Sequence, residues 1–196
     1  MSARLDLVVG CDGAGKSTLV ETVLAPILVD SAFVNADEIA KACWPEDPEV
    51  HSYDAAKIAA RTRSALLARG CSFIAETVFS HPSKLDLITE AHDRGFRVVL
   101  HVVMVPEDYA VERVRLRVVS GGHAVPEDKI RQRYARLWPL VATAIQRCEQ
   151  ATVYDNQNRT TRVVARFVEG SLVAEPHWPS WTPDALTNPA RYSDPE

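Results

Sequence analysis

Residues 10–17 read Gly-Cys-Asp-Gly-Ala-Gly-Lys-Ser, and this stretch decides the fold. It matches the pattern G-x-x-x-x-G-K-[ST] in full, and it follows a short apolar run at residues 5–9. A helical pattern begins at Lys16. A strand before this motif and a helix after it form the context in which such a loop cradles phosphate groups. The sequence therefore predicts a phosphate-binding loop between the first strand and the first helix.

The residue types in this loop suit a nucleoside triphosphate. Three glycines allow a tight turn whose N–H groups point inward, and the helix behind the loop adds the positive end of its dipole. The lysine is expected to reach the β- and γ-phosphates, and the serine hydroxyl is expected to ligate Mg²⁺. The predicted ATP-binding residues of the loop are Gly10, Asp12, Gly13, Ala14, Gly15, Lys16, Ser17 and Thr18.

Strand and helix patterns alternate along the rest of the chain. Short apolar runs at residues 32–35, 71–75, 96–105 and 151–154 are separated by helical stretches, and residues 162–168 are a candidate sixth strand. This alternation is typical of a mostly parallel sheet that is covered by helices on both faces. We therefore expect a three-layer α/β fold of the P-loop NTPase type, with a sheet of about five strands.

The end of the chain differs from the rest in composition and pattern. Residues 175–196 contain five prolines and no periodic pattern. We expect one P-loop domain over residues 1–169 and an irregular Pro/Trp-rich tail over residues 170–196. Trp178 and Trp181 are expected to hold part of this tail against the body, because large aromatic side chains are mostly buried.

Composition excludes several classes of protein. The 196 residues include 22 basic and 26 acidic side chains, a net charge of −4, whereas nucleic-acid-binding domains are usually basic. No apolar run approaches the roughly 20 residues of a membrane-spanning helix, and the N-terminus does not have the pattern of a secretory signal. The four cysteines are scattered without metal-ligand spacing. We therefore expect a cytoplasmic protein that binds neither membranes nor nucleic acids.

Transfer of a phosphoryl group also requires a carboxylate that orients the acceptor hydroxyl. Asp37 follows the second predicted strand and is a candidate for this base, although aspartate at that place could equally cap the next helix. Glu76 and Thr77 end the third predicted strand and are candidate substrate-binding residues. Glu76 could instead be the partner of a basic helix.

A candidate lid lies around residues 106–148, where two predicted helices flank a pair of glycines at positions 121 and 122. The segment from 113 to 136 carries seven positive and two negative side chains. Arginine suits phosphate because its planar guanidinium donates two parallel hydrogen bonds. Each arginine alone could instead be an ordinary surface residue, which is the commoner case. The candidates for contact with the transferred phosphoryl group are Arg117, Arg131 and Arg133.

Five segments, in this order, resemble the zeta toxin-like P-loop kinases, particularly their small stand-alone bacterial members. They are G-C-D-G-A-G-K-S-T, V-N-A-D-E-I-A, E-T-V-F-S, G-G-H-A-V-P-E-D-K-I-R-Q-R-Y and V-Y-D-N. The resemblance covers about residues 5–156, and G-G-H-x-V-P is its most specific part. It implies an adenylate-kinase-like core, ATP and Mg²⁺, and transfer to a sugar hydroxyl of UDP-N-acetylglucosamine. It also implies an antitoxin protein as a candidate partner.

The resemblance assigns roles by position. Asp37 matches the family's catalytic base, and Glu76 matches a substrate-binding acid. Asn156, in V-Y-D-N, matches a residue near the adenine. The cations that contact phosphate match Lys16, Arg117 and one of Arg131 or Arg133.

Three positions depart from the family pattern. Asp12 stands where asparagine is frequent, and Gln132 replaces a common arginine. Val78 stands where a threonine hydroxyl is expected near the substrate. The last difference affects the acceptor side most directly, while the ATP side is largely intact.

Other functions remain open at this point. The segment D-G-A-G-K-S-T is also similar to thymidylate kinases, but their D-R-[YH] segment is absent. An antibiotic kinase of similar fold is a further alternative, and a polynucleotide 5′-kinase would have to use the basic stretch. A non-catalytic ATP-binding switch would need no base at Asp37, so substitution of this residue separates a switch from a kinase.

Overall fold

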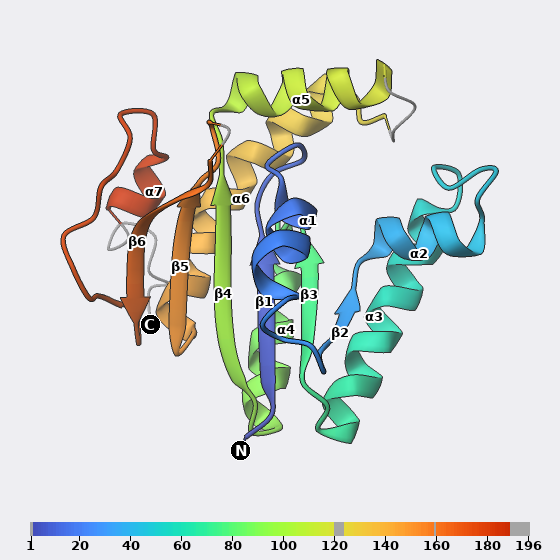
Figure 1. The fold of residues 1–196 in the computed structure, drawn as a ribbon, viewed down its shortest axis with the longest axis horizontal. Coiled ribbons are helices and arrows are strands. Elements are labelled where there is room, and N and C mark those ends of the chain that lie inside the picture. The colour runs from blue at the N-terminus through green and yellow to red at the C-terminus, as the bar shows by residue number, and fades with distance from the viewer. Residues whose placement is uncertain (1, 120–123, 159, 189–196) are drawn as a thin grey trace.

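The computed structural model describes residues 2–119, 124–158 and 160–188 of the chain. Its centre is one seven-stranded sheet with the order β2-β3-β1-β4-β5-β6-β7 (Figure 1). The strands are β1 (Arg4–Val9), β2 (Ala32–Val34), β3 (Phe73–Thr77), β4 (Arg97–Met104), β5 (Gln150–Asp155), β6 (Arg162–Val168) and β7 (Ser171–Leu172).

The mostly parallel α/β sheet predicted from the sequence is confirmed, but it has seven strands rather than about five. Strands β1 to β5 are parallel, and β6 and β7 are added antiparallel at one edge. The connections before β6 and β7 are too short for a crossover helix, and parallel strands need such a crossover. The chain therefore turns back on itself at this edge.

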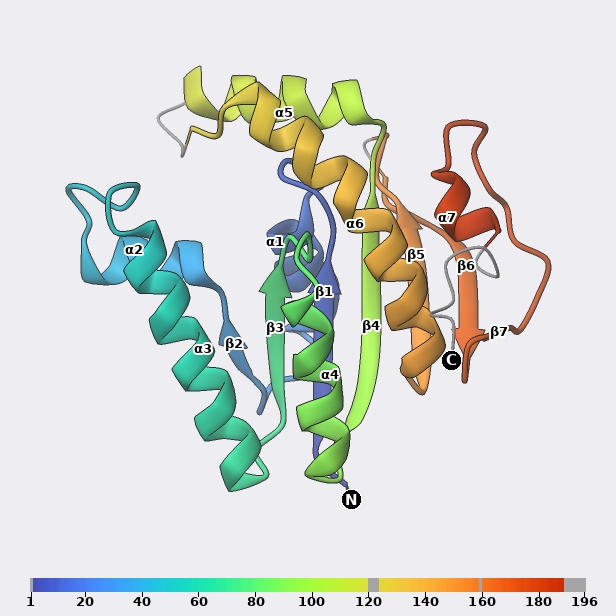
Figure 2. The ribbon, with the colours of Figure 1, turned by 180° about the vertical axis from the view of Figure 1, so that it is seen from behind.

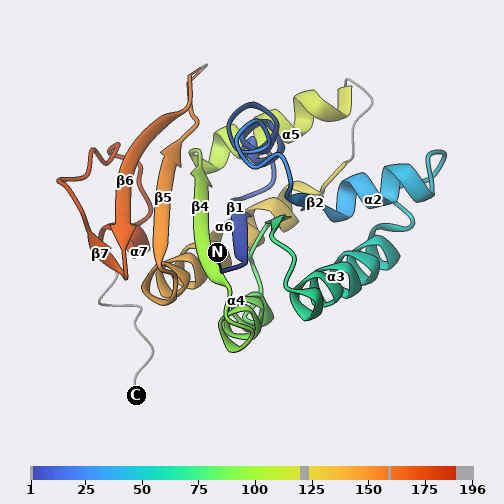
Figure 3. The same cartoon turned by 60° about the horizontal axis from the view of Figure 1, so that its bottom comes forward.

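Helices cover both faces of the sheet, as the three-layer prediction required. In Figure 2, α3, α4 and α6 lie on one face, whereas Figure 3 shows α1 on the opposite face. Helix α5 crosses the end of the sheet above β1 and β4 (Figure 1). The helical elements are α1 (Lys16–Leu19), the π-helical turn η1 (Val20–Leu24), α2 (Ala36–Cys43), α3 (Ser52–Arg69), α4 (Ser83–Asp93), α5 (Glu107–Val119), α6 (Glu127–Arg147) and α7 (Asp184–Thr187).

The apolar runs of the sequence form the middle of the sheet because both of its faces are covered. Leu5, Leu7 and Val9 of β1 are fully buried, and so are Leu100 and Val102 of the neighbouring β4. A strand that is buried on both faces reads as a continuous apolar run rather than an alternating one. The burial of β1 fixes the position of the loop that follows it.

Parallel register places the functional segments at one edge of the sheet. Val9, the last residue of β1, pairs with Thr77 at the end of β3, and Val34 of β2 pairs with Ala75. The segments after β1, β2 and β3 therefore emerge side by side at the carboxyl ends of the strands. In open α/β sheets this edge is where ligands bind.

The C-terminal segment, expected to be irregular, carries two short elements and packs on the same core. Trp178 and Trp181 contact the core, as predicted, and the Trp181 indole donates to Gln157 at 2.8 Å. Ala185 and Leu186 of α7 are buried. The boundary between 169 and 170 stays a prediction.

The predicted lid and the question of a membrane-spanning segment both concern the helices of the chain. The glycine pair at 121 and 122 lies outside the described residues. The two helices of the predicted lid are α5 and α6. Within the described ranges, no helix is both long and apolar enough to cross a bilayer.

Candidate active site

The loop that follows β1 has the geometry of an anion cradle. Gly13 and Gly15 adopt left-handed backbone conformations, with φ of 76° and 89°. A side chain at Gly10 would collide with the Val103 carbonyl oxygen of β4, and one at Gly15 would collide with the Asn156 amide. All three glycines are therefore required by the shape of the loop, which is a cradle that a Cβ would obstruct.

Lys16 lies across this loop instead of pointing into solvent. Its ammonium donates a hydrogen bond of 2.9 Å to the Cys11 carbonyl oxygen, and the residue is buried. Cys11 is itself buried, which raises the pKa of its thiol to about 12. Cys11 is thus a neutral thiol that fills space beneath the loop, and Lys16 is the positive charge of the cradle.

Ser17, Glu76 and Asn35 come from three different segments and form one hydrogen-bonded cluster. The Ser17 hydroxyl lies 3.0 and 3.2 Å from the two Glu76 carboxylate oxygens, and the Asn35 amide donates to Glu76 at 2.8 Å. Burial raises the pKa of Glu76, and the positive charge of Lys16 opposes that shift. A carboxylate is therefore held beside the hydroxyl that the sequence predicted as a metal ligand.

This donor set fits Mg²⁺. Hydroxyl and carboxylate oxygens are the hard ligands that Mg²⁺ prefers, and the ion usually takes one or two protein groups together with phosphate oxygens and water. Among the described residues, no group of three His, Cys, Asp or Glu side chains could hold a metal. Ser17 and Glu76 thus offer the one or two protein groups that such an ion takes.

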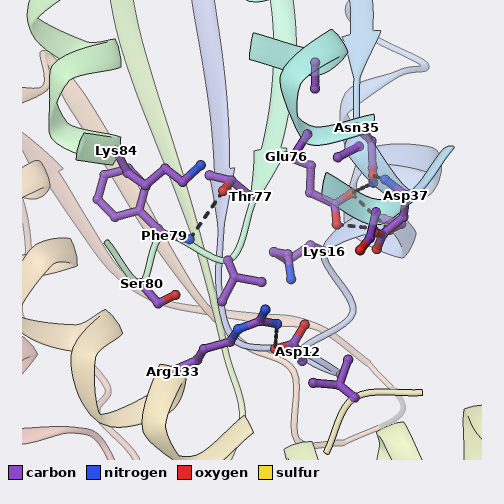
Figure 4. A pocket seen from close by; sticks show the side chains of 18 of the residues that line it. Asp12, Lys16, Asn35, Asp37, Glu76, Thr77, Phe79, Ser80, Lys84 and Arg133 are labelled. Carbon is purple, nitrogen blue, oxygen red and sulfur yellow. Dashed lines mark hydrogen bonds and ion pairs between the residues drawn. The ribbon is translucent and has the colours of Figure 1, made fainter. Parts of the chain in front are cut away.

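Asp37 is not the cap of helix α2, so one of the two interpretations of its position is wrong. The cap is Asn35, whose side-chain oxygen accepts from the Asp37 and Glu38 backbone N–H groups at 2.7 and 3.4 Å. Asp37 therefore sits inside the first helical turn with its carboxylate released from capping. Figure 4 shows it beside Asn35 and Glu76, facing the cavity.

A cavity of about 660 Å³ joins these groups. The loop after β1 forms one side, and the start of α2, the middle of α3 and the end of β3 form the other (Figure 4). The predicted site residues that line it are Asp12, Gly13, Gly15, Lys16, Ser17, Thr18, Asp37, Glu76, Thr77, Arg117 and Arg133. A volume of this size accommodates a small ligand together with phosphate groups.

Arg131 and Arg133, which the sequence left as alternatives for one phosphate contact, have different surroundings in the structure. Arg133 lines the cavity and pairs with Asp12 of the loop at 3.0 Å. Arg131 is not among the lining residues. It contacts three acidic side chains on the exposed side of the lid helices, at 3.0 to 3.5 Å, namely Glu107, Asp108 and Glu127. Of the two arginines, Arg133 is therefore the one that the structure places at the cavity.

Asn156 supports the loop from behind. Its amide donates to the Ala14 carbonyl oxygen at 2.7 Å, and its own side-chain oxygen accepts from Thr161 at 2.7 Å. Asn156, Ala14 and Gly10 are not among the residues that line the cavity. Contact of Asn156 with an adenine stays a prediction.

Sequence reasoning missed Arg113. Its guanidinium donates to the carbonyl oxygens of Asn156 and Gln157 at 2.8 and 3.2 Å, and it also lines the cavity. It joins α5 to the segment after β5. Its position one helical turn before Arg117 was the available signal, because residues four apart lie on the same face of a helix.

The end of the cavity next to β3 is lined by Val78, which the sequence analysis named, and by residues that it did not single out. Val78 lies there, so an apolar side chain occupies the place where a threonine was expected. Phe79 is fully buried with a φ of 59°, which turns the chain away from β3. Arg63 of α3 and Lys84 of α4 line the same end. No motif marked these two residues, since both lie in ordinary helical sequence.

Comparison with known proteins identifies the family. The zeta toxin family profile matches residues 2–165. An uncharacterized protein of Haemophilus influenzae is 30% identical over 128 residues, which are 64% of this chain and 88% of that protein.

Solved structures share the fold. The crystal structure of AvrRxo1-ORF1:-ORF2 with ATP has a TM-score of 0.71 and 14% identity, over 98% of this chain and 64% of that one. The PezAT chromosomal toxin-antitoxin system of Streptococcus pneumoniae has a TM-score of 0.61 and 12% identity, over 89% of this chain and 72% of that one.

These matches confirm the resemblance that the five sequence segments indicated. They also confirm the expectation of a P-loop phosphotransferase fold. The chain therefore belongs to the zeta toxin family and has the fold of the P-loop kinases.

Proposed function

We propose that this protein transfers the γ-phosphoryl group of ATP to a hydroxyl group of a small acceptor. The observation that carries this proposal is the single cavity lined by both the phosphate loop and the Asp37 carboxylate. Bringing an activated phosphoryl group and a base into one cavity is what a kinase requires, because the chemistry depends mostly on positioning and electrostatics.

The geometry supports the following roles. The amides of the loop and Lys16 bind the phosphates, and Arg117 and Arg133 neutralise charge on the transferred group. Asp37 accepts the proton of the acceptor hydroxyl. A bond forms between the acceptor oxygen and the γ-phosphorus, and the bond from that phosphorus to the oxygen of ADP breaks. Ser17 and Glu76 would hold Mg²⁺, whose charge offsets that of the phosphates when it is bound.

UDP-N-acetylglucosamine is the first acceptor to test, because it is the substrate that the family resemblance implies. Family membership supports this choice, and Val78 in place of a threonine weighs against it. The thymidylate, antibiotic and switch alternatives are decided by the same assay. A cytoplasmic location and an antitoxin partner stay predictions from the sequence and its family.

The test is phosphoryl transfer from ATP and Mg²⁺, read as an added mass on the acceptor. Wild-type protein is compared with the Lys16→Ala and Asp37→Asn variants. Glu38→Gln is the matched control, because Glu38 is an acid in the same helical turn that pairs with Lys41 at 2.8 Å instead of lining the cavity.

We expect the wild type and Glu38→Gln to form product. We expect Asp37→Asn to keep ATP binding and to lose transfer by about 10³-fold, a typical effect of removing a general base. Equal transfer by Asp37→Asn and the wild type would contradict the proposal. Binding of ATP without transfer to any acceptor in a pooled metabolite extract would favour the switch.

A further inference from the structure

A second, smaller cavity of about 220 Å³ lies between α3 and α4, next to the main one. Arg63, Glu76, Thr77 and Lys84 line both cavities, so the smaller one is a side chamber at the acceptor end. Its volume is below the range of pockets for whole small molecules but suits one functional group. Figure 4 shows Lys84 extending from α4 toward Thr77, the last residue of β3.

Two cations, Arg63 and Lys84, share this side chamber. Arg63 and Lys84 are both partly buried. Within the part of the chain that the structure describes, neither forms an ion pair or a side-chain hydrogen bond, whereas Arg4, Arg113, Arg131 and Arg133 all have such partners. A buried charge without a partner is costly, so it usually marks a place where a partner arrives.

Their electrostatics agree with this geometry. Burial lowers the pKa of both side chains, and the positive charge of Arg63 lowers the pKa of Lys84 further. The two cations are therefore close enough to repel each other. An anion between them would remove the repulsion and restore the interactions lost by burial.

Among the described residues that line the side chamber, Glu76 is the one carboxylate, and its oxygens bind other partners. Its oxygens accept from Ser17 and Asn35 at 2.8 to 3.2 Å. The cation that most lowers its pKa is Lys16, on the side of the phosphate loop. Glu76 thus faces the phosphate loop and leaves Arg63 and Lys84 without a negative partner.

We propose that Arg63 and Lys84 bind an anionic group of the acceptor, a phosphate or a carboxylate, while its hydroxyl group faces Asp37. This inference rests on the proposed kinase function and adds the class of substrate. The two ends of the cavity then have separate tasks. Lys16, Arg117 and Arg133 hold the phosphates of ATP, and Arg63 with Lys84 selects an acceptor that is itself an anion.

The binding test requires no catalysis. The protein is loaded with a non-hydrolysable ATP analogue and Mg²⁺, which occupy the phosphate loop. Inorganic phosphate and, separately, acetate are then titrated while the backbone amide NMR signals of residues 77–81, 83 and 84 are followed. Arg63→Gln and Lys84→Gln remove one charge each. Arg61→Gln is the matched control, because Arg61 is an exposed arginine of the same helix, and Lys84→Arg keeps the charge.

We expect a saturable shift in the wild type, in Arg61→Gln and in Lys84→Arg. We expect affinity to fall at least tenfold in both glutamine variants. Whichever of phosphate and acetate binds with the higher affinity identifies the class of the anionic group. No saturable shift with either anion, or the same affinity in the glutamine variants as in the wild type, would overturn the inference.

Failure of the kinase proposal is recognised separately. If the ATP analogue does not bind, the titration is repeated in the Lys16→Ala variant, where a shift of the same amide signals would still support an anion site. Once an acceptor is known, Arg63→Gln should raise its KM at least tenfold and leave kcat and the KM for ATP within threefold. A neutral acceptor with an unchanged KM would contradict the inference.

Discussion

The two ends of the cavity are built in different ways. The phosphate end comes from nine consecutive residues, 10–18, whose glycines and helix start are fixed by the strand before them. The acceptor end combines the start of α2, the middle of α3, the end of β3 and the start of α4, which lie far apart in the sequence. A continuous loop suits phosphate, the group that all nucleotides carry. A composite wall can change one segment at a time, so we expect substrates to be selected at the acceptor end.

The largest effect on stability and ATP binding is expected for Gly10→Ala, which disrupts the backbone of the phosphate end. The new Cβ would collide with the Val103 carbonyl oxygen, and a strand backbone cannot move as a side chain can. We expect a loss of about 3 kcal/mol in the free energy of unfolding, together with loss of ATP binding. Chemical denaturation and ATP titration measure both.

Gly70→Ala is the control for that substitution. Gly70 ends α3 with a φ of 65° and has no atom within 4 Å of an added Cβ. An alanine here introduces only backbone strain. We therefore expect the free energy of unfolding to fall by about 1 kcal/mol and ATP binding to stay normal. Equal losses in the two variants would mean that the phosphate end is not specifically constrained by β4.

The next effect compares Arg133→Ala with Arg131→Ala, two arginines separated by one residue on α6. Arg133 reaches the phosphate loop, whereas Arg131 pairs with acids on the exposed side. We expect kcat to fall about 10²-fold in Arg133→Ala, the effect of removing one charge-stabilising donor, and less than twofold in Arg131→Ala. Steady-state kinetics with saturating ATP measures both variants, and the reverse order would contradict the assignment.

The smallest effect concerns Glu76, where the two ends of the cavity meet. Burial raises its pKa in the folded protein, so the folded state binds a proton more tightly than the unfolded chain does. This carboxyl therefore lowers stability as the pH rises from its ordinary pKa through the raised one, and the penalty persists above that range.

Glu76→Gln removes this penalty while keeping the shape of the side chain. We expect the variant to be at least as stable as the wild type at neutral pH, with a smaller fall in the unfolding midpoint between pH 4 and pH 7. Its Mg²⁺-dependent transfer should nevertheless be impaired. Thermal unfolding across that pH range measures the difference, and a variant that is less stable at neutral pH would show that the Ser17 and Asn35 hydrogen bonds outweigh burial.

Most of the phosphate end was predictable from the sequence, because it is local. Adjacent residues determine the turn, the inward N–H groups and the helix start, so the motif predicts where Lys16 and Ser17 lie without knowledge of the fold. The order of strands and helices was predictable for a similar reason, since each apolar run is short and bounded. The two antiparallel strands at the edge were harder to predict, because their pairing depends on short connections rather than on periodicity.

The acceptor end was only partly predictable. Asp37 follows a strand and Glu76 lies at the end of one, so parallel register alone indicated that they emerge near the loop. Arg63 and Lys84 lie within helices whose sequence does not show which face meets a cavity. The same limit applied to Arg131 and Arg133, since the side of α6 that faces the loop is fixed by how the lid helices pack.

The sequence by itself therefore determined the fold class, the family and the phosphate loop, since these depend on residues that are neighbours in the chain. The tertiary structure decided which cap closes α2, which lid arginine reaches the loop and which cations stand unpaired at the acceptor end. The physical reason is that hydrogen bonds and charge pairs between distant segments depend on the packing of helices against the sheet, which no local pattern specifies.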